Sequence, residues 1–316
     1  MSSSVLAPLV PVVLCIAVGF AIARIGWVRA GAIPDLANIV FLVLTPALLF
    51  RTMGQVRVQE LDFAPVALYF SAVALLFGGT LALQGWNSAA AARALAHTFS
   101  NTVMIGVPFI GLVYGESGLV TLFTLVSLHS LILLTAATLV FELLLAPGAA
   151  AGGGAPHARW RTLGRAVKSS VIHPVPLPIL AGLAWGQTGW PVPGVLERAL
   201  ALLGSAVGPT ALLLVGITLA YTRIGQHWRG ALRIALVKNL AMPLLVGAVA
   251  WALGLSGQAV AVMCTTAAMP VGANVLLFTQ RYGTMQDEVS SAIAISTALA
   301  LLTLPLALLG AQWLTR

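Results

Sequence analysis

The fold is decided by the stretch Asn-Thr-Val-Met-Ile-Gly-Val-Pro-Phe-Ile-Gly-Leu-Val-Tyr-Gly, residues 101–115. The stretch is apolar enough for a lipid bilayer, yet it carries an amide at Asn101, a glycine at Gly106 and a proline at Pro108. Because proline lacks a backbone donor and clashes with the preceding turn, we expect the helix to break near Pro108. Backbone groups freed in hydrocarbon need a partner or a polar cavity, so this stretch is a candidate binding site.

A second interrupted stretch, Met269-Pro270-Val271-Gly272-Ala273-Asn274, lies in the other half of the chain. Two interrupted helices, one in each half, are typical of the substrate site of a secondary transporter. At such a crossing, the N-terminal ends of the half-helices present free N–H groups and partial positive charge, which suit a carboxylate. The predicted substrate-binding residues from these two stretches are Asn101, Gly106, Pro108, Met269, Pro270 and Asn274.

The composition is that of a multi-pass membrane protein. Of the 316 residues, 59% are hydrophobic and 8% are charged, and the mean hydropathy is +1.01. A soluble domain of this size needs far more charged surface. The net charge of +8 does not indicate nucleic acid, because the basic residues lie in short loops between apolar runs. Cys15 and Cys264 fall within apolar runs and are interpreted as buried hydrophobic residues.

A transmembrane helix needs about 20 apolar residues, and on that measure we expect ten crossings. The first apolar run follows no basic segment, so we interpret it as a retained helix. With both termini outside, eleven Lys and Arg residues fall in the inside loops and four fall outside, which favours this orientation in the plasma membrane. The basic connector 147–169 is then cytoplasmic. The expected crossings are 5–26, 33–52, 63–85, 92–113, 118–146, 170–188, 195–222, 230–254, 258–279 and 286–314.

The chain contains an internal repeat. The pattern Gly19-x-Ala21 recurs as Gly182-x-Ala184, and Pro46 recurs as Pro209, each shifted by 163 residues, while Pro108 and Pro270 differ by 162. Five helices in each repeat force the second copy to enter from the opposite side, so the repeats are inverted, over 1–146 and 170–316. The fourth and ninth helices, broken at Pro108 and Pro270, are expected to cross at the midplane. Gly182-x-x-x-Gly186 has the spacing of close helix packing.

Five stretches are informative together: Thr45-Pro46-Ala47-Leu48-Leu49-Phe50, residues 101–115, His173-Pro174, Met269-Pro270 and Asn274. With these motifs the sequence resembles the auxin efflux carrier family of permeases. The resemblance covers essentially the whole chain. It implies two inverted repeats related to the bile acid:sodium symporter fold, with helices 1, 2, 6 and 7 as a scaffold and helices 3–5 and 8–10 as a mobile transport domain. It further implies elevator-type transport of organic anions, and we expect a homodimer formed through the scaffold.

Two ionisable residues within predicted helices are further candidates. Lys238 lies about two turns into the eighth helix, where it either balances an anionic substrate in the cavity or snorkels to the cytoplasmic surface. His129 is a candidate for proton coupling, and the alternative is a hydrogen-bond donor in helix packing. For Asn101 and Asn274 the alternative is hydrogen bonding between helices.

Residue types that are missing narrow the function. Neither interrupted stretch contains Asp or Glu, which argues against a sodium/proton exchanger and for an anionic or neutral substrate. No motif indicates ATP hydrolysis, a metal site, a cofactor or a catalytic nucleophile. The sequence therefore predicts a secondary transporter for small carboxylates. An intramembrane enzyme, a cation exchanger, and a channel or receptor are the alternatives.

Overall fold

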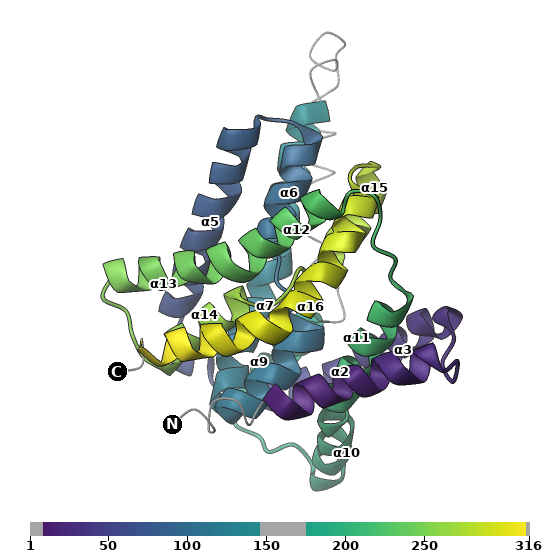
Figure 1. The fold of residues 1–316 in the computed structure, drawn as a ribbon. Coiled ribbons are helices and arrows are strands. Elements are labelled where there is room, and N and C mark those ends of the chain that lie inside the picture. Colours follow the sequence, from purple (N-terminus) through teal and green to yellow (C-terminus); the bar gives the residue numbers. More distant parts are fainter. Residues whose placement is uncertain (1–8, 146–174, 314–316) are drawn as a thin grey trace, which may run out of the picture.

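A computed structural model describes residues 9–145 and 175–313, and within these ranges the regular structure is entirely helical (Figure 1). The predicted connector 147–169 and the His173-Pro174 motif lie outside the described residues. The described helices α2 to α7 precede the connector, and α9 to α16 follow it.

The elements before the connector follow the expected crossings, except around the first interrupted stretch. Helix α7 contains Gly115 at φ 67°, which divides it into two helical parts. The bounds are α2 Leu9–Arg24, η1 Ala30–Ala32, α3 Ile33–Ile39, η2 Val40–Leu44, α4 Thr45–Met53, η3 Val58–Glu60, α5 Ala64–Gln84, α6 Ser88–Thr98, η4 Thr102–Gly106 and α7 Val107–Leu145.

The elements after the connector again include continuous helices and helices interrupted by a π turn or a non-helical segment. The bounds are α9 Pro176–Thr188, α10 Gly194–Ser205, α11 Val207–Tyr221, α12 Trp228–Leu236, η6 Val237–Ala241, α13 Met242–Ala252, α14 Gln258–Ala267, α15 Asn274–Tyr282 and α16 Gln286–Trp313.

Six helical stretches in the described ranges are long and apolar enough to cross a membrane, with two shorter apolar helices beside them. The six are Ala30–Met53, Ala64–Gln84, Thr102–Phe141, Gly194–Tyr221, Trp228–Ala252 and Gln286–Ala311, and the shorter two are Leu9–Arg24 and Gln258–Ala267.

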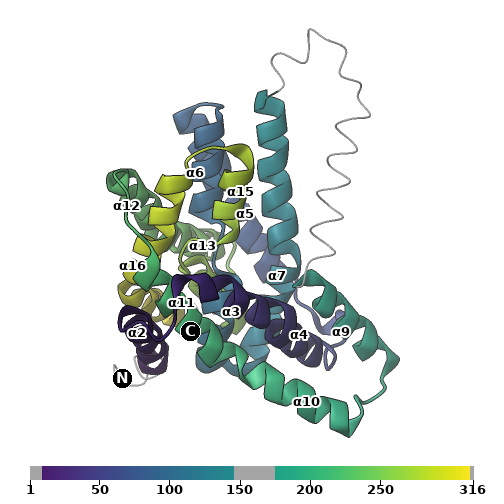
Figure 2. The same ribbon diagram turned by 90° about the vertical axis from the view of Figure 1, so that its right-hand side faces the viewer.

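The helices form two groups that meet at the interrupted stretches. The first helix group comprises α2–α4 and α9–α11, in which α2 packs on α11 and α4 packs on α9 and α10. The second helix group comprises α5–α7 and α12–α16, in which α5 packs on α6, α13 and α14. Figure 2 shows the first group below and α5, α6, α12 and α15 above it. Helix α7 contacts α4, α9 and α11 and so joins the groups.

Glycines allow the closest helix contacts of the first group. A β-carbon on Gly19 would collide with the Leu213 carbonyl oxygen of α11, and one on Gly182 would lie 2.7 Å from the Phe50 carbonyl oxygen of α4. A β-carbon on Gly186 would lie 2.5 Å from the Val56 carbonyl oxygen. The close-packing interpretation of Gly182 and Gly186 is therefore confirmed.

Three π-helical turns, η2, η4 and η6, share one cause. Each is followed two residues later by a proline: Pro46, Pro108 and Pro243. A proline ring clashes with the carbonyl group four residues before it, and a widened π turn makes room for the ring without ending the helix. These three prolines thus widen a helical turn without ending the helix, and the helix breaks lie at other positions.

Candidate functional site

The first helix break lies ahead of Pro108. Helix α6 ends at Thr98, residues 99–101 are non-helical, and η4 begins at Thr102 and continues into α7. Pro108 is the second residue of α7 and lies inside the resumed helix. The prediction of a break at Pro108 is therefore wrong, because the π turn η4 ahead of it makes room for the proline ring without ending the helix.

The second break does contain its proline. Helix α14 ends at Ala267, α15 begins at Asn274, and Pro270 lies between them. The residue before a proline is restricted to extended conformations, so Met269 cannot continue α14. Pro108 and Pro270 are thus not equivalent in position, although their spacing nearly matches that of the repeat.

The two breaks pair with each other through their backbones. Ser100 and Val271 form an isolated antiparallel bridge. The Asn101 N–H donates to the Pro270 carbonyl at 2.9 Å, and the Gly272 N–H donates to the Phe99 carbonyl at 2.9 Å. This pairing satisfies backbone groups that two broken helices would otherwise leave exposed to hydrocarbon.

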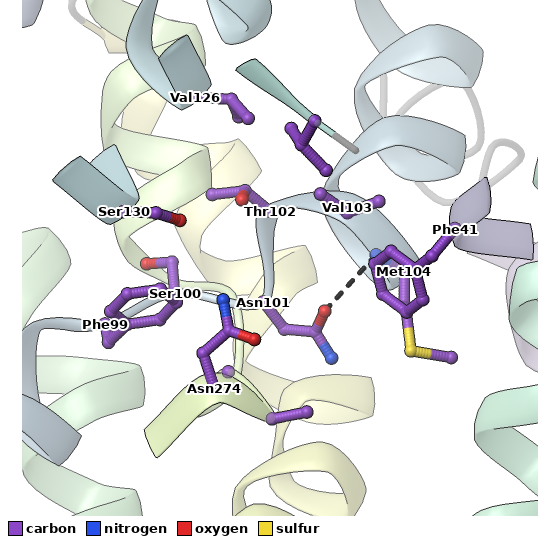
Figure 3. Close-up of a pocket in the computed structure, with 13 residues that line it drawn as sticks. Phe41, Phe99, Ser100, Asn101, Thr102, Val103, Met104, Val126, Ser130 and Asn274 are labelled. Carbon is purple, nitrogen blue, oxygen red and sulfur yellow. Dashed lines mark hydrogen bonds between the residues drawn. The ribbon is translucent and has the colours of Figure 1, made fainter. Parts of the chain in front are cut away.

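A small pocket lies beside the paired segments (Figure 3). Its volume is about 50 Å³, and its lining contains no carboxylate. The lining combines hydroxyl and amide side chains with aromatic and aliphatic ones. The lining residues are Phe41, Phe99, Ser100, Asn101, Thr102, Val103, Met104, Val126, Ser130, Val175, Gly272, Ala273 and Asn274.

The two predicted asparagines both line this pocket, one from each break. The Asn101 side-chain oxygen accepts the Met104 N–H at 3.2 Å and so caps η4. Among the hydrogen bonds of the described residues, none involves the Asn101 amide nitrogen or the Asn274 side chain. These amide groups are available to a ligand in the pocket.

The pocket also receives the beginnings of two helices. Thr102 to Met104 open η4, and Asn274 opens α15. Several of the first N–H groups already have partners: the Thr102 N–H donates to the Ser100 carbonyl, the Met104 N–H to Asn101 Oδ1, and the Val275 N–H to the Gly272 carbonyl. The helix starts therefore contribute mainly the partial positive charge of a helix N-terminus. A pocket with two such helix starts, two amides and no acidic side chain suits a small anion.

A buried polar cluster lies behind Ser100. The Tyr69 hydroxyl of α5 lies 2.9 Å from Ser100 Oγ and 3.4 Å from His129 Nε2. The His129 ring packs edge-on against Phe99, with ring centroids 4.5 Å apart, and its Nδ1 is buried without a hydrogen-bond partner. His129 therefore lies outside the pocket lining but packs directly against Phe99, which is part of it.

Lys238 follows neither expectation drawn from the sequence. Its side chain is fully buried, so it does not snorkel to a membrane surface, and it does not line the pocket. The ammonium instead donates to the Ala267 carbonyl at 2.5 Å and to the Met269 carbonyl at 2.7 Å. Lys238 thus contacts the end of α14 behind the second break.

The other predicted residues lie outside the pocket lining. Gly106 donates its N–H to the Asn101 carbonyl at 3.0 Å, and neither Pro108, Met269 nor Pro270 lines the pocket. Sequence reasoning missed Ser100 in the first break and the contributions of Phe41 and Ser130. Ser100 directly precedes Asn101, but no local pattern marks Phe41 or Ser130, which only tertiary packing brings to the pocket.

Comparison with known proteins gives a match over nearly the whole chain. Residues 4–308 match the family described as "Membrane transport protein". A relative from Rhizobium meliloti (strain 1021), named "Putative malonate transporter", is 28% identical over 275 residues, which cover 84% of this chain and 82% of that protein.

Proposed function

This chain belongs to the membrane transport protein family, the auxin efflux carrier family, and we propose that it is a secondary transporter for small organic anions such as carboxylates. The family and the apolar helices make it a multi-pass membrane protein. The family is one of transporters, so the chain is a transporter rather than an enzyme. The resemblance found in the sequence is thereby confirmed at the level of the family.

The observation that carries the proposed substrate class is the pocket between the two breaks. It gathers the amides of Asn101 and Asn274 and the beginnings of η4 and α15, and its lining contains no acidic side chain. A cation exchanger would need carboxylates in this position to hold its ion. A carboxylate substrate instead accepts hydrogen bonds from the side-chain amides and is attracted by the partial positive charge of the two helix starts.

The size of the pocket and the named relative narrow the substrate. A volume of about 50 Å³ accommodates roughly four water-sized groups, enough for one end of a small carboxylate. The similarity to a protein named as a malonate transporter makes a short dicarboxylate the first substrate to test.

Reciprocal contacts support the proposal of two inverted five-helix repeats with ten crossings. Gly19 of α2 meets the Leu213 carbonyl of α11, and Gly182 of α9 meets the Phe50 carbonyl of α4. Gly182 is Gly19 shifted by 163 residues, and Leu213 is Phe50 shifted by the same number. The contact of Gly19 with Leu213 and the contact of Gly182 with Phe50 are therefore the same contact with the two halves interchanged. A two-fold axis between the repeats produces such a pair of contacts.

We place the first helix group as the scaffold and the second as the mobile transport domain of an elevator. The interrupted helices α6–η4–α7 and α14–α15 would then carry the pocket with the second group. In this proposal both termini lie outside the plasma membrane, and two copies associate through the scaffold helices.

Purified protein in proteoliposomes tests the proposed function. We expect saturable counterflow of labelled malonate, with succinate, acetate and alanine as competitors of graded similarity. Counterflow requires that one site alternate between the two sides, so a channel or receptor would not produce it. Failure of every carboxylate to bind in a thermal-shift screen, with a neutral solute binding instead, would overturn the substrate class.

A further inference from the structure

We propose that the Lys238 ammonium acts as a tethered cation at the end of α14, and that the protein therefore carries its anion without a co-transported alkali-metal ion. This inference rests on the proposed function, because it concerns how that transport is coupled. The ammonium lies behind the second break and bonds to Ala267 and Met269, on the opposite side of the break from Asn274.

The carbonyl groups at this break account for the position of Lys238. The end of a helix leaves carbonyl groups without donors. Residues after the break cannot supply them: Pro270 has no N–H, the Val271 N–H donates to Ser296 Oγ at 3.1 Å, and the Gly272 N–H donates to the Phe99 carbonyl. The carbonyls of Ala267 and Met269 thus receive their donors from the Lys238 side chain alone among the described groups.

Unwound carbonyls at the end of an interrupted helix are the ligands with which secondary transporters bind a coupling sodium ion. The partial negative charge at a helix C-terminus adds to the attraction for a cation. Here both carbonyls point at a side-chain ammonium that is fixed to η6, so the position of a dissociable cation is already filled.

The charge of Lys238 has no acidic counterpart nearby. Ion pairs of the described residues involve Arg51 with Glu116 and Glu197, and Arg93 with Glu288, but none involves Lys238. A fully buried charge without a counter-ion is costly unless other groups offset it. An anion in the pocket across the break would supply that offset, which links Lys238 to the substrate without direct contact.

Replacement of Lys238 separates this role from simple packing. Lys238→Ala removes the ammonium and leaves room for a free cation, whereas Lys238→Met removes the charge but fills most of the space. Arg233→Met is the matched control, because Arg233 is a basic residue on the preceding turn of α12 and is exposed. The melting temperature of each purified protein is measured without substrate in choline, sodium and methylammonium chloride at equal ionic strength.

We expect the parent and Arg233→Met to melt at the same temperature in all three salts. Lys238→Ala should melt lower in choline and regain stability in methylammonium or sodium, because a ligand that binds the folded state raises its stability. Lys238→Met should melt lower and regain little. This part of the test needs no substrate, so it stays informative even if the proposed carboxylate transport fails.

Uptake in proteoliposomes completes the test. We expect parent uptake to be equal in sodium and choline, and uptake by Lys238→Ala to fall at least tenfold in choline and to recover in part with methylammonium. A parent protein that needs sodium overturns the inference, and so does a Lys238→Ala protein that is equally stable and active in every salt. If Lys238→Ala does not fold in any salt, two other measurements test the proposal: the sodium dependence of parent uptake and the uptake activity of Lys238→Arg. Parent uptake that needs sodium overturns the proposal, and so does an inactive Lys238→Arg protein.

Discussion

At the scale of single residues, the two asparagines of the pocket differ in what else they do. Asn101 caps η4 through Met104 and also offers its amide nitrogen to the pocket. Asn274 opens α15, and its side chain has no hydrogen bond to another described group, so its amide is free to serve the pocket. Replacement of Asn101 therefore removes a helix cap together with a proposed substrate contact, whereas replacement of Asn274 removes only the proposed substrate contact.

We predict that Asn101→Leu and Asn274→Leu both weaken carboxylate binding by roughly 5- to 150-fold, because an unmade hydrogen bond to a buried charged partner costs about 1–3 kcal/mol. Asn101→Leu should in addition lower the stability by about 0.5–2 kcal/mol through loss of the cap. Calorimetric affinities and melting temperatures, measured side by side, check both parts. Unchanged affinity in both variants would move the site away from this pocket.

At the scale of helices, the breaks show what sequence can and cannot predict. Pro270 does lie within the second break, between α14 and α15, where it disfavours a helical conformation of Met269. The first break, at residues 99–101, contains no proline and is held by pairing with residues 270–272, which no local pattern reveals. Pro108 drew the prediction to the wrong place, since its effect is absorbed by the π turn η4.

The same distinction carries over to the pocket. The asparagines were predictable because an amide next to a break in an apolar helix is unusual. The sequence marks Lys238 as a candidate functional residue because it is ionisable and lies within a predicted transmembrane helix. Its hydrogen-bond partners could not be predicted, because they depend on the tertiary position of α14. Phe41 comes from η2 and Ser130 from the part of α7 after Gly115, and only tertiary packing places them in the lining.

We predict that Pro270→Ala lowers the maximal uptake rate about tenfold, equivalent to about 1.4 kcal/mol of activation free energy. Alanine lets α14 extend through Met269, which disturbs the pairing with residues 99–101. Pro108→Ala should have a smaller effect, because Pro108 lies inside the resumed helix and only the π turn before it can relax. Initial rates at saturating substrate test the order, and a larger loss in Pro108→Ala would contradict it.

We predict that Gly182→Ala destabilises the first helix group by about 1–3 kcal/mol, the usual cost of overpacking. Its β-carbon would lie 2.7 Å from the Phe50 carbonyl oxygen and 3.0 Å from the Gly54 nitrogen, so two backbones must separate. Gly247→Ala in α13 is the control, because no atom lies within 4 Å of its β-carbon. The control should be neutral or stabilising, by up to about 1 kcal/mol. Equal melting temperatures for the two variants would show that α4 and α9 are not closely packed in the membrane.

At the scale of the whole molecule, Arg51 of α4 joins the two helix groups. Its Nε lies 2.6 Å from Glu197 Oε1 of α10, in the same group, and its Nη1 lies 3.9 Å from Glu116 Oε1 of α7, in the other group. An elevator moves one group as a body against the other. The contact with Glu197 should therefore persist through the transport cycle, and the contact with Glu116 should break.

Cross-linking across these two contacts tests the elevator. In a background with Cys15 and Cys264 replaced by alanine, cysteines are introduced at 51 and 116 in one protein and at 51 and 197 in another. A reducible bifunctional thiol reagent that spans the distance of a long ion pair joins each pair. Both proteins lose Arg51, so the loss of this side chain cannot explain a difference between them.

We expect the 51–116 cross-link to abolish uptake and reduction to restore it, because the link ties the moving group to the scaffold. The 51–197 cross-link should leave uptake unchanged, since both residues lie within the first helix group. Binding of carboxylate by thermal shift should survive in both cross-linked proteins, because the pocket is built from residues away from these links. Uptake that continues through the 51–116 cross-link would mean that the two groups do not move past each other at this contact, and the alternation of access would then have to arise within the second helix group itself.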